Sequence, residues 1–491
     1  MLSPIRISDA RANSSYWEAT ESQTTPLALF LVKAGFPHRL SAAPGGSQYL
    51  NDDAAKLGRG KVVFAENCAR CHSSKYPEPP AETNPSACKA GDYNTCFNKY
   101  WAWTKTDGFK SQMREIVAKP DFLEGNFLSN DRRVPSTLLQ TNMCSPLATN
   151  AIANHIWDDF SSQTYKGLPS AGTVDVADPV TGKPVKFTLP GGGRGFTRPP
   201  SLVSLWSTAP FFVNNTLGRF EVEPSVEARM RSFDDSIRQL LWPEKREQDS
   251  KFGNTVGGAI DRIQEPTYLI VPREQLPGAI QSTMGFWNWL APGIFTDGAK
   301  KHDFKGSTTA GSKTVTGVNV AAPLSTFYAG APVSGPGIAA GSRVVVFDAA
   351  AKTLTLDLAA TAAGKDAALQ TDAPDIGVRI GPLPIGMPIN LLPGVELASE
   401  TPAWPDRIKH TMNLIGGLWN VKSSWVSYAT SSNPAEKDKA LISLQNELRS
   451  MDKCPDYVVN RGHYFGTDQF KEEPGLNDAD KEALIAFLKT F

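Results

Sequence analysis

Cys68-Ala-Arg-Cys71-His72 places two thiols three positions apart and an imidazole directly after the second thiol. This spacing is typical of c-type haem attachment: each cysteine forms a thioether to a former vinyl group of the porphyrin, and the histidine binds iron from the proximal side. A thioredoxin-like dithiol would not need His72. A zinc site would need a second Cys/His pair at metal-ligand spacing, and no other CxxC occurs in the sequence. The motif therefore predicts one covalent haem c per chain, bound by Cys68, Cys71 and His72.

The segment before this motif, residues 54–67, reads as a helix that runs into the attachment loop. Gly60 and Phe64 share one face of it, and a glycine at that place lets another helix approach closely. The end of the chain offers a partner helix with Asn477 as its N-cap and an apolar stripe formed by Leu484, Ile485, Phe487, Leu488 and Phe491. We expect the two helices to cross beside the haem, because c-type cytochrome domains are built in this way.

The composition excludes some classes of partner. Lysine plus arginine (50) equals aspartate plus glutamate (50), so nothing favours nucleic acid or an anionic membrane surface. The longest apolar runs are far below the roughly 18–20 residues that a membrane span needs. With 491 residues the chain is long enough for two or three compact units.

The six cysteines indicate an oxidising compartment. Cys88 and Cys96 flank a Gly-Asp-Tyr-Asn turn and are close enough for a local disulfide, which leaves Cys144 and Cys454 as the other pair. Stable disulfides and covalent haem attachment both form outside the cytoplasm, so we expect a periplasmic or extracellular protein. The first eight residues show no basic region followed by an apolar core, and we therefore expect a mature product or a truncated start rather than a visible signal peptide.

Composition also divides the chain into regions. In residues 304–372 charge drops and Ala, Gly, Thr, Ser and Val dominate, and short strands are expected over 314–320, 342–347 and 353–358. Residues 111–165, by contrast, look mainly helical. The predicted fold is mainly α: a cytochrome c-like haem domain with long helical and loop insertions, plus a small β-rich inserted module. The expected regions are an N-terminal extension (1–50), the first part of the haem-binding region (51–303), the β-rich insert (304–372) and the C-terminal part (373–491).

The sixth iron ligand has two main candidates. His463 lies in Arg461-Gly-His-Tyr-Phe-Gly466, just before the terminal helix, which must pack near the haem if the helices cross. Met230 lies on an amphipathic helix expected over 225–241 and is the alternative. A second histidine would lower the reduction potential and a methionine would raise it. Met143 is a third candidate, and as a neighbour of Cys144 it fits a core position equally well. His155, His302 and His410 are interpreted as structural.

Three stretches together carry a family resemblance. The chain resembles the large c-type cytochromes related to bacterial di-haem cytochrome c peroxidases and to the rubber oxygenases. The resemblance rests on the Cys68–His72 loop, on the stretch Pro200-Ser-Leu-Val-Ser-Leu-Trp-Ser-Thr-Ala-Pro-Phe-Phe212, and on Arg461–Gly466 with the terminal helix. Residues 454–466, which end in Arg461–Gly466, are called the late loop. The peroxidases imply a methionine ligand near Met230, whereas the rubber oxygenases imply a late-loop histidine, which His463 matches. The chain departs from the peroxidases in having one CxxCH, and in carrying Val213 where they have a histidine.

These observations predict a c-type cytochrome that binds one covalent haem and transfers electrons outside the cytoplasm. Its partner would be a redox protein or a small electron donor or acceptor. The alternative is a haem peroxidase-like or oxygenase-like oxidoreductase that acts with a second haem domain or partner. A third hypothesis gives the β-rich insert a binding role and the haem a structural one.

Overall fold

The computed structural model describes the chain except for residues 1–6, 52, 86–87, 145–146, 148–161, 266, 272, 274–275, 277, 291–294, 296–299, 320–326, 328–329, 349–350, 374–376, 393 and 397–403. It forms two compact units. The first, called here the split unit, comprises residues 4–260 and 454–491, and the second, the inserted unit, comprises 261–453. Ile260 and Val458 pair in an antiparallel bridge, so the chain leaves and re-enters the split unit at one place.

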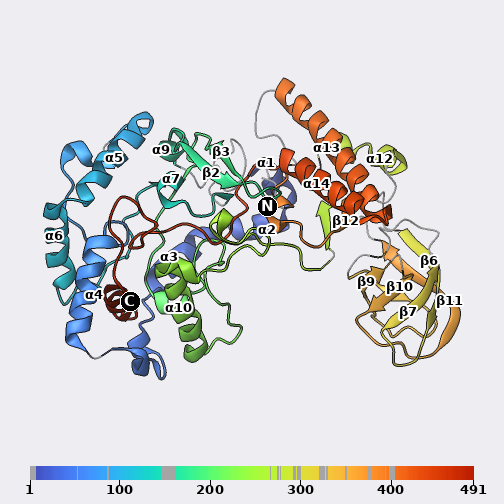
Figure 1. Cartoon of the computed structure of the whole chain (residues 1–491), viewed down its shortest axis with the longest axis horizontal. Coiled ribbons are helices and arrows are strands. Elements are labelled where there is room, and N and C mark those ends of the chain that lie inside the picture. Colours follow the sequence, from blue (N-terminus) through green and yellow to red (C-terminus); the bar gives the residue numbers. More distant parts are fainter. Residues whose placement is uncertain are drawn as a thin grey trace. The chain divides into compact units, whose positions relative to one another are not determined.

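The split unit consists of helices joined by long loops and short strands (Figure 1). Among the described residues, its strands pair in twos, β1 with β4 and β2 with β3. Its elements are α1 (Ile7–Asn13), α2 (Ser15–Glu21), α3 (Thr24–Ala34), α4 (Ala54–Asn67), α5 (Tyr93–Thr104), α6 (Asp107–Ala118), β1 (Val134–Pro135), α7 (Ser136–Leu139), α9 (Gln163–Lys166), β2 (Thr173–Ala177), β3 (Pro184–Thr188), β4 (Phe196–Thr197), α10 (Val226–Leu241) and α15 (Asp478–Leu488).

The helices α4 and α15 cross as the sequence predicts. Asp53 caps α4 and Asn477 caps α15, each accepting a hydrogen bond from N–H groups of its helix's first turn. The crossing lies at Gly60, where an added Cβ would stand 2.2 Å from the carbonyl oxygen of Ala483. Figure 1 shows the C-terminal helix beside α4, and the glycine explains how the two backbones approach so closely.

Aromatic side chains fill the space around this crossing. The ring of Phe64 on α4 meets Phe487 and Phe491 edge to face, with ring centres 5.6 and 5.1 Å apart. Met230 and Phe233 of α10 belong to the same buried cluster. The Cys68–His72 motif therefore begins where three helices from distant parts of the sequence share one core.

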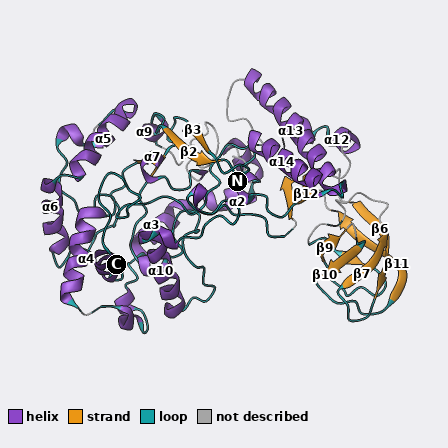
Figure 2. Cartoon of the chain, viewed as in Figure 1, coloured by secondary structure: helices purple, strands orange, loops and turns teal. Residues whose placement is uncertain are grey.

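The inserted unit contains a six-stranded sheet with strand order β8-β11-β6-β7-β10-β9 (Figure 2). Its helices α13 and α14 pack against each other, and Ser424 and Ser443 bond across them through their hydroxyls. Its elements are β5 (Thr267–Val271), α11 (Gly278–Gln281), α12 (Met284–Leu290), β6 (Lys300–Thr308), β7 (Thr314–Asn319), β8 (Val333–Ser334), β9 (Val344–Asp348), β10 (Thr353–Leu356), β11 (Gly364–Ala373), β12 (Val378–Leu383), α13 (Trp404–Thr430) and α14 (Pro434–Ser450).

The prediction of a mainly α fold is wrong: the protein is mixed α/β, with 42% helix and 16% strand. Two errors account for the difference. The sheet draws on the strands β6, β8 and β11, which the sequence patterns did not indicate, and it spans residues 300–373 rather than 304–372. Residues 111–165 were expected to be mainly helical, but their first helix, α6, ends at Ala118 because Pro120 cannot continue a helix.

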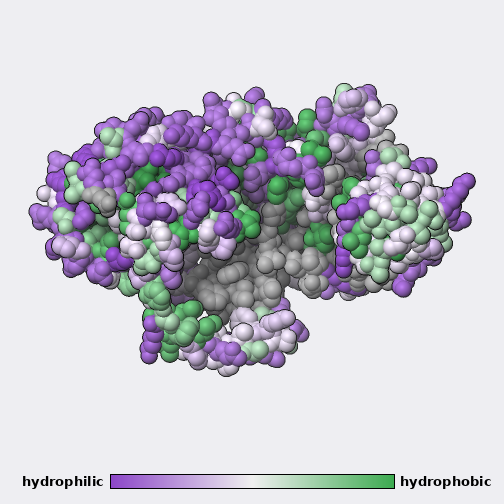
Figure 3. Space-filling view, turned by 90° about the horizontal axis from the view of Figure 1, so that it is seen from below, coloured by the Kyte–Doolittle hydropathy of each residue, from purple (hydrophilic) through white to green (hydrophobic). Residues whose placement is uncertain are grey.

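The surface carries both polar and apolar areas. Seen from below, hydrophilic residues cover much of it and apolar patches interrupt them (Figure 3). On α3 the side chains of Leu27, Phe30 and Val32 are exposed. Within the described residues, every helix is too short or too polar to traverse a lipid bilayer.

Candidate haem site

A cavity of about 390 Å³ lies inside the split unit, next to the crossing helices. Apolar side chains of α10 and α15 form much of its wall, together with the segments 197–215 and 463–466. Cys68, Cys71, His72 and His463 all line it. A cavity of this size and character is typical of a cofactor site. The structure thus brings together four residues that lie up to 395 positions apart in the sequence.

The turn after α4 directs the motif toward the cavity. The N–H groups of Cys71 and His72 both donate to the carbonyl of Cys68, which closes a tight turn directly after the helix. Side chains beneath the turn hold its carbonyls: Tyr100 donates to the oxygen of Arg70 at 3.0 Å, and Asn130 donates to the same oxygen at 2.5 Å. Both thiols and the imidazole are therefore fixed on a rigid turn.

The Pro200 carbonyl orients the His72 ring, in the way that a carbonyl partner commonly orients a metal-binding histidine. Nδ1 of His72 lies 3.1 Å from the carbonyl oxygen of Pro200, so Nδ1 carries the proton and Nε2 is left for the cavity. Burial lowers the pKa of His72 to about 4, although the main-chain hydrogen bonds act in the opposite direction. The imidazole is therefore neutral at pH 7, which is the form that binds a metal.

His463 faces His72 from the late loop. Its N–H donates to the carbonyl of Leu139, and its backbone adopts the left-handed conformation with φ of +51°. Nδ1 of His463 is buried and, among the described residues, meets no partner beyond its own main chain. Burial lowers its pKa to about 3, and the nearby His72 acts in the same direction. This imidazole is also neutral at pH 7.

The separation of the two imidazoles suits one metal between them. Their ring centres are 6.2 Å apart and their planes are inclined at 45°. Metal–imidazole bonds of about 2 Å, with about 1 Å from each nitrogen to its ring centre, place two axial imidazoles about 6 Å apart. The residues present therefore fit a bis-histidine iron, with covalent attachment through the adjacent thiols.

The thiols do not have the properties of a redox dithiol. Cys68 and Cys71 are free, while the other four cysteines pair. Burial raises the pKa of Cys68 to about 12 and that of Cys71 to about 11, although Arg70 lowers both. Disulfide oxidoreductases need the reverse, a pKa lowered to near or below neutrality. In the described part of the chain, no three His, Cys, Asp or Glu side chains gather to hold a bare metal ion.

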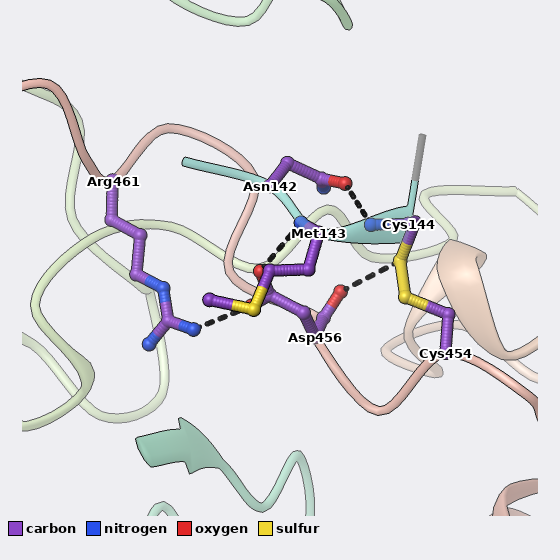
Figure 4. Close-up of a disulfide and its surroundings, with 6 residues drawn as sticks. All are labelled: Asn142, Met143, Cys144, Cys454, Asp456 and Arg461. Atoms are coloured by element: carbon purple, nitrogen blue, oxygen red, sulfur yellow. Dashed lines mark hydrogen bonds and ion pairs between the residues drawn. A yellow bond between two sulfur atoms is a disulfide. The ribbon is translucent and has the colours of Figure 1, made fainter. Parts of the chain in front are cut away.

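The pairs Cys88–Cys96 and Cys144–Cys454 are disulfide-bonded. Figure 4 shows the second bridge joining the segment around Met143 to the start of the late loop. Beside it, the buried Asp456 accepts hydrogen bonds from the N–H of Met143 at 3.1 Å and from Arg461 at 2.9 Å. Burial raises the pKa of Asp456, while Arg461 acts against that shift. The late loop is thus attached to the segment around Met143 by the disulfide and by the hydrogen bond from Met143 to Asp456, which also pairs with Arg461 inside the loop.

The other candidate ligands that the structure describes are not among the residues that line the cavity. Met230 is 1% exposed, belongs to the buried cluster around α10 and is not among the residues that line the cavity. Met143 is buried in a separate cluster with Leu147, Val174, Val176, Leu189 and Cys454. His302 and His410 belong to the inserted unit, on β6 and α13. His155 lies outside the described residues.

Some residues of the site have no signal in the sequence. The Pro200 carbonyl is a main-chain group, and Tyr100 and Asn130 act from loops and helices that no motif connects to the haem turn. The segment 200–212 was noticed for its resemblance, and the structure places most of it in the cavity wall.

A scan of family models, a search of curated proteins and a search of solved structures each found no match for this chain. The resemblance to the di-haem peroxidases and rubber oxygenases therefore stays a prediction.

Proposed function

We propose that this protein is a c-type cytochrome that transfers electrons outside the cytoplasm. The observation that carries the proposal is the pair of neutral imidazoles, 6.2 Å apart, across a cavity that also holds two free thiols. Cys68 and Cys71 would attach the haem, and His72 and His463 would bind its iron from opposite sides. When bound, a haem with two histidine ligands supplies one-electron chemistry at a lowered potential.

The chain's own residues would keep the site closed. The Pro200 carbonyl would orient the His72 ring, and the Leu139 carbonyl would hold the main chain of His463. Leu484 and Leu488 of α15 and Ile237 of α10 make this part of the wall apolar, which would disfavour water beside a bound haem. The two disulfides support a location outside the cytoplasm, and the partner would be a redox protein or a small electron donor or acceptor.

The test is covalent attachment combined with ligand exclusion. Haem should remain on the protein after denaturation and acid extraction, and replacing both thiols (Cys68→Ala, Cys71→Ala) should release it. The reduced protein should reoxidise in a single one-electron step and should bind carbon monoxide poorly. Haem that extracts from the native sequence would refute covalent attachment.

One observation favours the peroxidase-like or oxygenase-like alternative. Thr208, Pro210, Phe211 and Phe212, from the stretch that resembles the peroxidases, line the cavity. Val213, in place of a histidine, is also part of the wall and is 70% exposed. Ready binding of carbon monoxide and turnover of peroxide with an added haem-protein donor would favour this alternative over the electron carrier.

A further inference from the structure

We infer that Arg246 is the positioning residue that fixes His463 in the cavity, an inference that rests on the proposed function. Arg246 is 5% exposed and follows α10 after one 3-10 turn, Pro243–Lys245. Its guanidinium donates to four main-chain carbonyls. Two belong to the end of α10, Gln239 at 2.8 Å and Leu240 at 3.2 Å. Two belong to the late loop, Asn460 at 3.2 Å and Gly462 at 2.9 Å.

The charge of Arg246 is balanced without a carboxylate. Among the described residues no acidic side chain forms an ion pair with it. Its partners are carbonyl oxygens, the Tyr464 side chain, with which it forms a hydrogen bond, and the ring of Phe212. Two of those oxygens stand at the negative end of the α10 dipole. The rings of Phe212 and Tyr464 lie 5.6 and 4.9 Å from the guanidinium carbon. Arg246 thus contacts three segments next to the cavity: α10, the 210–215 wall and the late loop.

The geometry requires an arginine. A planar guanidinium has five donors in a fixed fork, so it can hold two pairs of carbonyls at once, whereas a lysine ammonium acts as a point charge. Removing the fork leaves buried carbonyls without donors, which is costly. These carbonyls can regain hydrogen bonds at the lowest cost if the late loop shifts.

The late loop has reason to shift when released. Gly462 has φ of +101°, and His463 has φ of +51°, a conformation that a histidine adopts at a cost. Arg246 holds the Gly462 carbonyl directly before His463. Without this contact the backbone can leave the left-handed region, and the imidazole would then withdraw from its place opposite His72.

The experiment measures access to the iron in the full-length, haem-loaded protein. Arg246→Met removes the fork, and Arg246→Lys keeps the charge and is the milder change. Arg238→Met is the matched control: Arg238 lies on α10, eight positions before Arg246, but its side chain is 43% exposed and pairs with Glu482 on α15. We expect the reduced Arg246→Met protein to gain a carbon monoxide-binding fraction, and Arg246→Lys to gain a smaller one. The Arg238→Met control should bind as little carbon monoxide as the native protein does.

A second readout separates positioning from general damage. Excess free imidazole should occupy the vacated iron position of Arg246→Met and restore the low-spin absorption spectrum, while circular dichroism confirms that the helices persist. If Arg246→Met does not fold, Arg246→Lys carries the test.

His463→Ala in the same assay distinguishes the two levels of the account. If His463→Ala binds carbon monoxide but both Arg246 variants exclude it, the role of Arg246 is refuted and the ligand assignment stands. If His463→Ala also excludes carbon monoxide, the proposed ligand pair fails.

Discussion

Two neighbouring residues of the late loop, Gly462 and His463, have left-handed backbone conformations that the surrounding structure maintains. An added Cβ at Gly462 would lie 2.4 Å from the Thr141 nitrogen, so this position requires glycine. His463 follows it in a conformation with positive φ. Backbone strain of this kind persists where neighbouring contacts over-determine it, and it concentrates at functional sites. The strain therefore agrees with a ligand role for His463.

At the same scale, one ion pair predicts a pH dependence. Asp480 on α15 pairs with Arg59 on α4 through two contacts, 2.5 and 2.8 Å long. The hydrogen bond from Arg59 lowers the pKa of Asp480, against the effect of burial. A carboxylate with a lowered pKa adds stability above its unfolded pKa of about 4, and this stability is lost as pH falls through the folded pKa.

We expect Asp480→Asn to cost about 0.5 kcal/mol at pH 7, because Arg59 is half exposed and solvent screens the pair. The difference from the native protein should shrink toward zero as the pH falls below 4. Urea unfolding from pH 7 to pH 2 measures it. A difference that stays constant over this range would show that the ion pair is not its source.

At the scale of elements, the crossing of α4 and α15 builds the cavity. Leu484 and Leu488 of α15 reach the cavity wall, and α4 ends in the haem turn. A change in the distance between these two helices would therefore alter the wall and the attachment turn together.

Two glycines of α4 give a prediction with opposite signs. Gly60→Ala places a Cβ 2.2 Å from the Ala483 oxygen and 2.9 Å from the Phe487 Cβ, and we expect a loss of about 1–3 kcal/mol. Gly58→Ala meets nothing within 4 Å and should gain about 0.5–1 kcal/mol from the lower flexibility of alanine. The denaturant midpoints of both variants, compared with that of the native protein, measure these two changes in stability. Equal effects of the two changes would contradict a close crossing at Gly60.

The elements also mark how far the sequence could be interpreted. The crossing helices follow from local signals that the sequence shows, namely Gly60 on α4 and the Asn477 N-cap and apolar stripe of α15, and both helices were predicted. The contacts of Arg246 and the Pro200 carbonyl were not, because main-chain partners leave no trace in residue identity. The strands β6, β8 and β11 were missed because β8 has two residues, while β6 and β11 carry charged residues such as Lys301 and Lys365.

At the scale of the whole molecule, the chain is organised as one unit interrupted by another. The inserted unit separates Ile260 from Cys454 in the sequence, yet the segments on either side belong to the same split unit. The Cys144–Cys454 bridge and the Ile260–Val458 pairing join these segments. The last 38 residues, which carry His463, depend on such links to find their place.

The two disulfides should therefore contribute differently to the free energy of unfolding. Cys144–Cys454 spans 310 positions and Cys88–Cys96 spans 8. A bridge that closes a longer loop restricts the unfolded chain more, so Cys144→Ser with Cys454→Ser should cost roughly 2–5 kcal/mol and exceed the cost of Cys88→Ser with Cys96→Ser. Equilibrium unfolding of the two double variants makes the comparison. A larger loss from the short-loop pair would contradict the tethering role of Cys144–Cys454.

The central claim is that His72 and His463 bind one iron from opposite sides. Its most direct test is a low-temperature electron paramagnetic resonance spectrum of the oxidised protein, recorded together with His463→Ala and Met230→Ala. We expect a low-spin ferric signal in the native protein and in Met230→Ala, and a high-spin signal in His463→Ala. A native protein that is high-spin, or a low-spin signal that survives in His463→Ala and disappears in Met230→Ala, would contradict the account.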